Sequence, residues 1–107
     1  MSKPAGSLDR QQLDAMVEEA TVDCYNEEEQ ATGLFTLLED HLALPFQTRV
    51  LGFPVTVDSI DLTASDEIVA VCSRDGAQQR IPILDLPLPT SPPEGAEWID
   101  AYRHWHG

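Results

Sequence analysis

The fold class is decided by residues 26–51, NEEEQATGLFTLLEDHLALPFQTRVL, where a helical pattern gives way to a strand pattern. Asn26 is a preferred N-cap residue, and Glu29 stands three residues later, in the capping-box position. Apolar residues then recur at helical spacing: Ala31, Leu34, Phe35, Leu38 and Leu42. Because Pro45 cannot continue a helix, and alternating and β-branched residues follow it, the stretch predicts a helix followed by a strand.

A further helix is predicted upstream, over residues 8–23, with Ser7 as its N-cap. Its apolar positions again follow helical spacing and are Leu13, Met16, Val17, Ala20 and Cys24. Acidic residues occupy the remaining faces. The first 42 residues therefore predict an N-terminal helical pair.

Four short strands are predicted after Pro45, over residues 48–51, 55–60, 67–73 and 79–84. A hairpin turn is indicated by Asp75-Gly76, and residues 63–66 form a polar loop. Successive hairpins predict an antiparallel sheet. Four or five strands of this size favour a small SH3-like or Sm-like barrel, because closure removes exposed edges.

Four prolines within residues 87–93 predict an extended connector, since proline fits neither a helix interior nor a central strand. Residues 94–106 predict a short helix whose aromatic side chains dock back onto the domain. A chain of 107 residues supplies one hydrophobic core, so we expect a single α+β domain. Its parts are the helical residues 8–42, the β residues 46–86, the connector 87–93 and the helix 94–106.

The charge of the chain excludes several classes of partner. Six Lys and Arg oppose 19 Asp and Glu, which gives a net charge of −13. Such a surface repels nucleic acid and anionic membranes. No apolar run is long enough to span a bilayer, and MSKPAGSLDR does not resemble a signal peptide, so we expect a cytoplasmic protein.

Carboxylates gather at both ends of the second predicted helix. Asp23, Glu27, Glu28 and Glu29 lie at the junction between the two helices, where backbone carbonyls are also free. Glu39 and Asp40 lie one helix length away. Calcium prefers six to eight oxygen ligands, so these six residues are the candidate metal ligands, although Glu27 to Glu29 also suit a simple helix cap. No EF-hand loop is present, because residues 61–72 lack the turn glycine and the final glutamate.

Other chemistry is poorly represented. Cys24 and Cys72 have no CxxC spacing and are predicted to be buried, reduced thiols. His104 and His106, with Asp100 one turn earlier, offer a weak transition-metal site or a solvated helix end. No serine has a nucleophile motif and no glycine-rich phosphate loop exists, so we predict that the protein is not an enzyme.

The acidic junction carries a resemblance to a known family. Residues 21–30, TVDCYNEEEQ, together with residues 38–42, LEDHL, and Pro45-Phe46, resemble the signature of the small acidic calcium-binding proteins described from cyanobacteria. Those proteins do not use EF-hands. The likeness extends over residues 18–106, to an aromatic-rich closing helix. It departs in the second helix, where the family tends to be aromatic and this chain has Leu34, Thr36 and Leu37.

Two functions are consistent with these features. The first, which the resemblance also implies, is reversible binding of Ca²⁺ by the clustered carboxylates, as a buffer or a sensor. The alternative is an acidic protein-interaction module without a metal, which docks an unidentified basic partner and offers the Pro-rich residues 86–93 as a peptide ligand.

Overall fold

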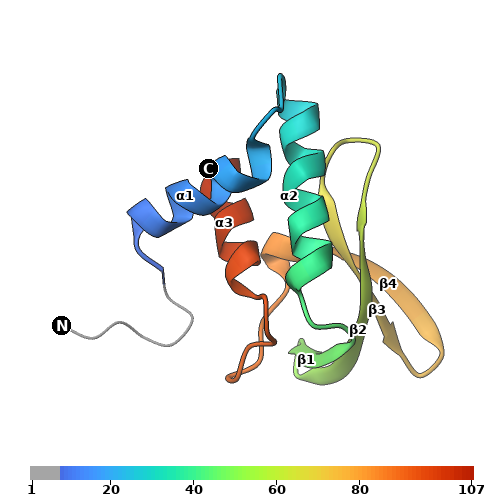
Figure 1. The fold of residues 1–107 in the computed structure, drawn as a ribbon. Coiled ribbons are helices and arrows are strands. Elements are labelled where there is room, and N and C mark those ends of the chain that lie inside the picture. Colours follow the sequence, from blue (N-terminus) through green and yellow to red (C-terminus); the bar gives the residue numbers. More distant parts are fainter. Residues whose placement is uncertain (1–7) are drawn as a thin grey trace. The chain divides into compact units, whose positions relative to one another are not determined.

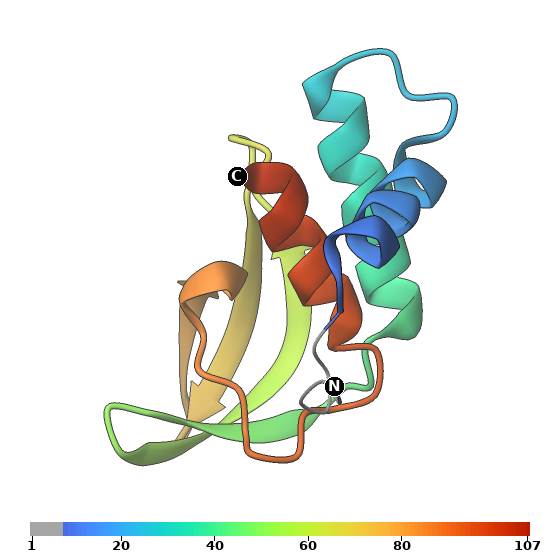
Figure 2. The same ribbon diagram turned by 90° about the vertical axis from the view of Figure 1, so that its left-hand side faces the viewer.

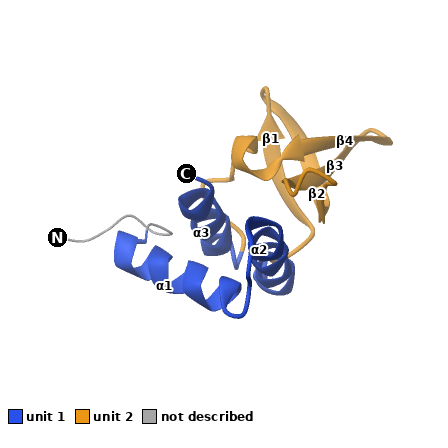
Figure 3. Ribbon diagram, turned by 90° about the horizontal axis from the view of Figure 1, so that it is seen from above, with its two compact units in different colours: residues 1–42, 94–107 blue, residues 43–93 orange. Residues whose placement is uncertain are grey.

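A computed structural model describes residues 8–107 and shows in them three α-helices and a four-stranded antiparallel sheet (Figures 1 and 2). The chain divides into two compact units (Figure 3). The helical unit comprises residues 1–42 and 94–107, and the β unit comprises residues 43–93. In sequence, the β unit is therefore an insertion between the second and third helices of the helical unit.

Helix α1 spans Arg10–Thr21 and begins with a capping box. Asp9 Oδ1 accepts a hydrogen bond from the Gln12 backbone N–H at 2.8 Å, and Gln12 Oε1 accepts one from the Asp9 N–H at 3.1 Å. Two N–H groups that a helix start leaves unpaired are thereby satisfied. The predicted cap, Ser7, lies outside the described residues.

Helix α2 spans Glu27–His41 and starts at the predicted N-cap. Asn26 Oδ1 accepts from the Glu29 N–H at 2.8 Å. The Glu29 carboxylate reaches back to the Tyr25 N–H at 2.6 Å, one residue earlier than a capping box requires. The predicted apolar stripe is confirmed, with Phe35 partly exposed and the other members buried: Ala31, Leu34, Leu38 and Leu42.

Helices α1 and α2 approach each other closely at Gly33. A Cβ atom built on Gly33 would lie 2.2 Å from the Ala20 carbonyl oxygen and 3.5 Å from Cys24 Sγ. Any side chain at this position would force the two helices apart. The contact therefore fixes how α1 meets α2, and with it the geometry of the junction between them.

Helix α3 spans Glu97–His106 and packs against α1 and α2, as predicted. Four of its side chains are buried: Trp98, Ile99, Ala101 and Tyr102. His104 Nε2 lies 2.6 Å from Asp14 Oδ1 of α1. Trp105 Nε1 donates to Gln30 Oε1 of α2 at 2.9 Å, so α3 joins both other helices of the unit.

Gly95 forms the entry to α3 and lies against the end of α2. Its φ of +88° is in the left-handed region that favours glycine. A Cβ on Gly95 would lie 2.0 Å from the His41 carbonyl oxygen. Beside this contact, the His41 ring stacks on Trp98 with ring centroids 5.4 Å apart and an interplanar angle of 13°. Within the helical unit, the end of α2 and the start of α3 are therefore in direct contact.

The β unit is a meander of four strands in the order β1-β2-β3-β4. The strands are β1 (Phe46–Val50), β2 (Phe53–Leu62), β3 (Ile68–Arg74) and β4 (Ala77–Pro82). The predicted turn at Asp75-Gly76 is confirmed, and a second two-residue turn occurs at Leu51-Gly52. All four turn residues have positive φ, between 51° and 83°, which matches the type I′ turns of tight hairpins.

The α+β class and the order of the elements are confirmed, but the sheet is open and does not close into an SH3-like or Sm-like barrel. Strands β1 and β4 lie at opposite edges. Closure would need a further strand to bridge them. Instead, Ile83–Asp85 form a 3₁₀ helix, η1, and the proline connector that follows cannot enter a sheet interior.

One face of the sheet is buried along much of its length. Residues that point to it include Val57, Ile60, Ile68, Ala70 and Cys72.

Burial, with a smaller effect from Asp58, raises the pKa of the Cys72 thiol, as suits the predicted inert thiol. The prediction for Cys24 is wrong in part, because this thiol is only half-buried. In the described residues, no helix is long and apolar enough to cross a membrane.

Candidate metal centre

The candidate centre is the junction of residues 22–26, between α1 and α2. Val22 is the C-cap of α1, and Asp23 follows with φ at +67°. Aspartate enters this left-handed region more readily than most residues, and here it turns the chain out of the helix. The Cys24 N–H then donates to the Thr21 carbonyl at 3.0 Å. The junction thus places a carboxylate beside the carbonyl end of a helix.

The electrostatics of this helix end favour a cation. The last carbonyls of a helix have no partners within it and carry the negative end of the helix dipole. The last turn of α1 contains no basic residue that would neutralise this end. In the described part of the chain, no basic side chain pairs with Asp23, Glu27 or Glu28.

The four junction acids differ in their availability. All four side chains are exposed. Glu29 is engaged as a cap, because its carboxylate holds the Tyr25 N–H. Within residues 8–107, Asp23, Glu27 and Glu28 have no such bond and can turn toward an ion. The junction therefore offers three free carboxylates and one that fixes the local backbone.

The other two predicted residues are not brought to the junction. Glu39 and Asp40 lie in the last turns of α2. Twelve residues separate Glu27 from Glu39, which corresponds to about 18 Å along a helix. The six acids therefore form two separate groups. Across residues 8–107, no three His, Cys, Asp or Glu side chains are arranged to hold a metal ion, so neither group is a preassembled cage.

Two other metal candidates from the sequence are engaged elsewhere. Asp61, which begins the loop that imitates an EF-hand, forms an ion pair with Arg80. His104 pairs with Asp14, and His106 lies edge-on to the Tyr102 ring at 5.8 Å. The terminal histidines thus contribute to packing of α3, a role that helical spacing alone did not indicate.

Asp100, on α3, has a raised pKa, chiefly because of burial; Arg103 opposes the shift and Glu97 adds to it. The ordinary pKa of an aspartate carboxyl is 3.8, and a raised pKa in the folded protein makes a contribution to stability that is fully present below pH 3.8. This contribution is lost as the pH rises through the raised pKa. We therefore expect Asp100→Asn to raise the urea midpoint at pH 7, with a smaller gain at pH 4. Glu94→Gln, at an exposed position, is the control. An equal gain at both pH values would contradict the expectation.

Comparisons with known proteins bear on the family and on the fold. The profile of a family described as calcium binding, Calci_bind_CcbP, matches residues 14–106. The crystal structure of Anabaena CcbP superposes with a TM-score of 0.75 at 17% sequence identity, covering 96% of this chain and 95% of that one. A calcium-binding protein in its calcium-binding form gives 0.72 at 18% identity, covering 97% and 95%. No curated protein sequence gives a significant match.

Proposed function

Because this chain belongs to the CcbP family of calcium-binding proteins, we propose that it binds Ca²⁺ reversibly at the α1–α2 junction. Asp23, Glu27 and Glu28 are the proposed carboxylate ligands, supplemented by backbone carbonyls of the last turn of α1 other than that of Thr21, which accepts from the Cys24 N–H. Glu29 holds the backbone in place. Glu39 and Asp40 are proposed as a second, weaker group at the other end of α2.

The observation that carries this assignment is the uncompensated negative end of α1. Asp23 adds a carboxylate directly beyond that end, and the last turn has no basic residue. The sequence of the helical unit contains thirteen acidic and three basic residues, so the surrounding field also attracts cations. A divalent ion at this point would relieve repulsion among carboxylates as well as neutralise the helix end.

The chemistry of the junction suits calcium better than magnesium. Calcium accepts six to eight oxygen ligands in adaptable geometry, which exposed carboxylates and water can supply. Magnesium requires a tight octahedron and retains its water. Since the ligands are not preassembled, we expect dissociation constants of about 10⁻⁵ to 10⁻³ M, the range of weaker sensors and extracellular modules.

The test is a calcium titration of Asp23→Asn combined with Glu27→Gln. We expect the tightest site to weaken at least about tenfold, because two ligand charges are lost. The apo protein should become slightly more stable, since Asn favours the left-handed region and the net negative charge of the helical unit falls by two. Calorimetry measures the affinity, and thermal unfolding in EDTA measures the stability.

The matched control is Asp66→Asn combined with Glu67→Gln. Asp66 also has a left-handed φ, of 63°, and this pair removes the same charge from the β unit. Unchanged affinity in the junction variant, or an equal loss in the control, would refute the placement. Amide shifts upon titration separate the two roles: shifts confined to residues 21–29 indicate a buffer, whereas shifts that extend into α3 indicate a sensor.

The alternative, an acidic interaction surface, is favoured by one observation. Val22 and Tyr25, beside the junction acids, are 65% and 89% exposed, and aromatic residues are enriched at interaction sites. In this case millimolar Ca²⁺ should give only a weak response that salt suppresses, because no ion is held by several ligands at once.

We further propose that the chain is not a catalyst, acts in the cytoplasm and binds neither nucleic acid nor membranes. The net charge of −13 supports the last two exclusions.

We also propose that the two compact units unfold together, as one domain. A single calorimetric transition would be expected, and two separate transitions would contradict this.

A further inference from the structure

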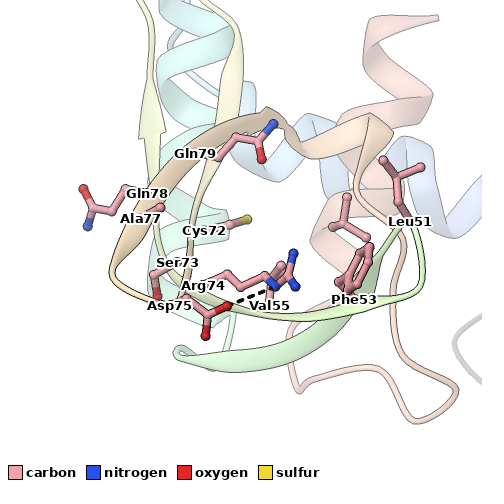
Figure 4. A pocket seen from close by; sticks show the side chains of 11 residues that line it. Leu51, Phe53, Val55, Cys72, Ser73, Arg74, Asp75, Ala77, Gln78 and Gln79 are labelled. Carbon is pink, nitrogen blue, oxygen red and sulfur yellow. Dashed lines mark ion pairs between the residues drawn. The ribbon is translucent and has the colours of Figure 1, made fainter.

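A pocket of about 520 Å³ lies between the two hairpins of the β unit (Figure 4). Leu51, Phe53 and Val55, from the β1–β2 hairpin, form an apolar wall. Strands β3 and β4 and the turn between them form the opposite wall, where Cys72 is buried. A cavity of this volume has the size of a site for a small molecule.

The charged part of the pocket is one pair of adjacent residues. Among the described lining residues, only Arg74 and Asp75 are charged, and their charges cancel. Arg74 Nε lies 3.6 Å from Asp75 Oδ2 (dashed line in Figure 4), which is longer than a hydrogen bond. Within residues 8–107, neither side chain forms a hydrogen bond. Guanidinium donors and carboxylate acceptors are therefore available side by side.

The arginine of this pair also adjoins the apolar wall. Its Cζ atom lies 4.1 Å from the centroid of the Phe53 ring, which is a cation–π contact. Phe53 is 51% exposed, so part of the ring remains accessible beside this contact. A small molecule bound to Arg74 would therefore have its remaining atoms within reach of the Phe53 ring.

Leu51 is a costly residue at its position. It has a φ of +53°, which is unfavourable for leucine, and its side chain is 92% exposed. Glycine or asparagine would form this turn with less strain and without exposing an apolar group. Packing within the β unit therefore does not explain Leu51, whereas contact with an apolar group of a ligand would.

The charge pair determines which class of ligand fits. An anionic ligand would compete with Asp75 for Arg74, and a cationic ligand would compete with Arg74 for Asp75. A zwitterion offers a partner to both residues without this competition. The net charge of −13 also opposes an apolar anion, whereas a ligand of zero net charge is not repelled. In an α-amino acid the two charged groups are attached to one carbon atom, so their partners must be adjacent, as Arg74 and Asp75 are.

We propose that the hairpin pocket binds a free α-amino acid with an aliphatic side chain. Its carboxylate accepts hydrogen bonds from the Arg74 guanidinium, and its ammonium group donates to the Asp75 carboxylate. Its side chain contacts the apolar wall and covers part of the exposed Leu51 side chain. The pocket lies within the β unit and contains none of the proposed calcium ligands, so the two sites are separate.

The test is an NMR titration of the full chain with leucine, in EDTA and about 0.15 M salt. We expect saturable amide shifts in residues 50–55 and 72–79, with a dissociation constant of about 1 mM, which suits a small ligand in an open site. N-acetyl-leucine lacks the ammonium group, leucinamide lacks the carboxylate, and glycine lacks the aliphatic side chain. Each of these three should bind at least about fivefold more weakly. Because EDTA removes calcium, failure of the proposed calcium site would not alter this result.

The decisive variant is Asp75→Asn, because asparagine suits the φ of +51° at this turn. We expect leucine to bind at least about fivefold more weakly and no better than N-acetyl-leucine, since the ammonium contact is lost. Asp66→Asn is the matched control. Asp66 also has a left-handed φ, of +63°, and lies in the β unit outside the pocket, so this variant removes the same charge without the contact. It should leave the affinity for leucine unchanged.

Several results would overturn the proposal. Equal binding of leucine, N-acetyl-leucine and leucinamide would show that the charge pair does not select the ligand. An equal loss of affinity in Asp66→Asn would show that the net charge of the β unit, and not the contact with Asp75, controls binding. A lack of saturable shifts would also overturn it, as would shifts that depend on the protein concentration alone, because these would identify a second copy of the chain as the occupant.

Discussion

Gly95→Ala is expected to lower the free energy of unfolding by about 3–5 kcal/mol. Two effects add in this variant. The φ of +88° becomes strained once a Cβ is present, and that Cβ would lie 2.0 Å from the His41 carbonyl oxygen. Relief requires α3 to move away from the end of α2, which also disturbs the His41 and Trp98 stack. Urea unfolding followed by tryptophan fluorescence measures the loss.

The matched control for Gly95 is Gly76→Ala. Gly76 has a similar φ of +83°, but a Cβ there would meet nothing within 4 Å. This control therefore isolates backbone strain, which we expect to cost about 1–2 kcal/mol. If both variants lost the same stability, the close approach of Gly95 to α2 would be disproved as a source of destabilisation.

Gly33→Ala is expected to destabilise the protein by about 2–4 kcal/mol, although alanine is normally the better helix former. Its Cβ would lie 2.2 Å from the Ala20 carbonyl oxygen, so α1 must move relative to α2. Cys24, at the junction, lies on the same side at 3.5 Å from the new atom. We therefore expect calcium affinity to fall as well, because the junction acids change their spacing.

Thr32→Ala serves as the control for helix propensity, since Thr32 is an exposed neighbour on α2. It should leave stability within about 0.5 kcal/mol of the original chain. Stability measured in EDTA separates packing loss from calcium loss. A stabilising effect of Gly33→Ala would show that the helices have room at this point and would contradict the proposed contact.

Local signals predicted most of the elements correctly. The N-cap at Asn26, the apolar stripe of α2 and the turn at Asp75-Gly76 each depend on residues close together in sequence. The Leu51-Gly52 turn was missed, because leucine is not a residue that indicates positive φ. For the first helix the sequence favours Ser7 as the cap, whereas in the described residues Asp9 and Gln12 share that role.

Non-local features could not be predicted in the same way. The edge strands β1 and β4 decide whether this sheet closes into a barrel. They would be joined only if the rest of the chain supplied a further strand between them. The sequence predicts strands here but not the short helix at Ile83–Asp85. Likewise, the close approaches of Gly33 and Gly95 involve backbone atoms of distant residues, for which no sequence pattern exists.

For the candidate centre, the sequence indicates which acids lie near the helix junction, but their role as metal ligands stays a prediction. Glu29 occupies the capping-box position, which predicts that its carboxylate accepts a hydrogen bond from the N-cap residue. The observed bond comes from the N–H of Tyr25, one residue before that N-cap. The left-handed φ of Asp23 was not predicted, because aspartate at that position has no distinctive neighbours. The separation of Glu39 and Asp40 from the junction follows from helix geometry alone.

The insertion of the β unit between α2 and α3 has a consequence for folding during translation. The ribosome delivers α1 and α2 first, then the whole β meander, and only afterwards the residues of α3. Until Trp98 and Tyr102 emerge, the apolar stripes of the first two helices lack one of their packing partners. The hairpins, whose contacts are local, can form during that interval. The nascent helical pair therefore keeps apolar surface exposed until α3 is delivered, whereas the hairpins can already be paired.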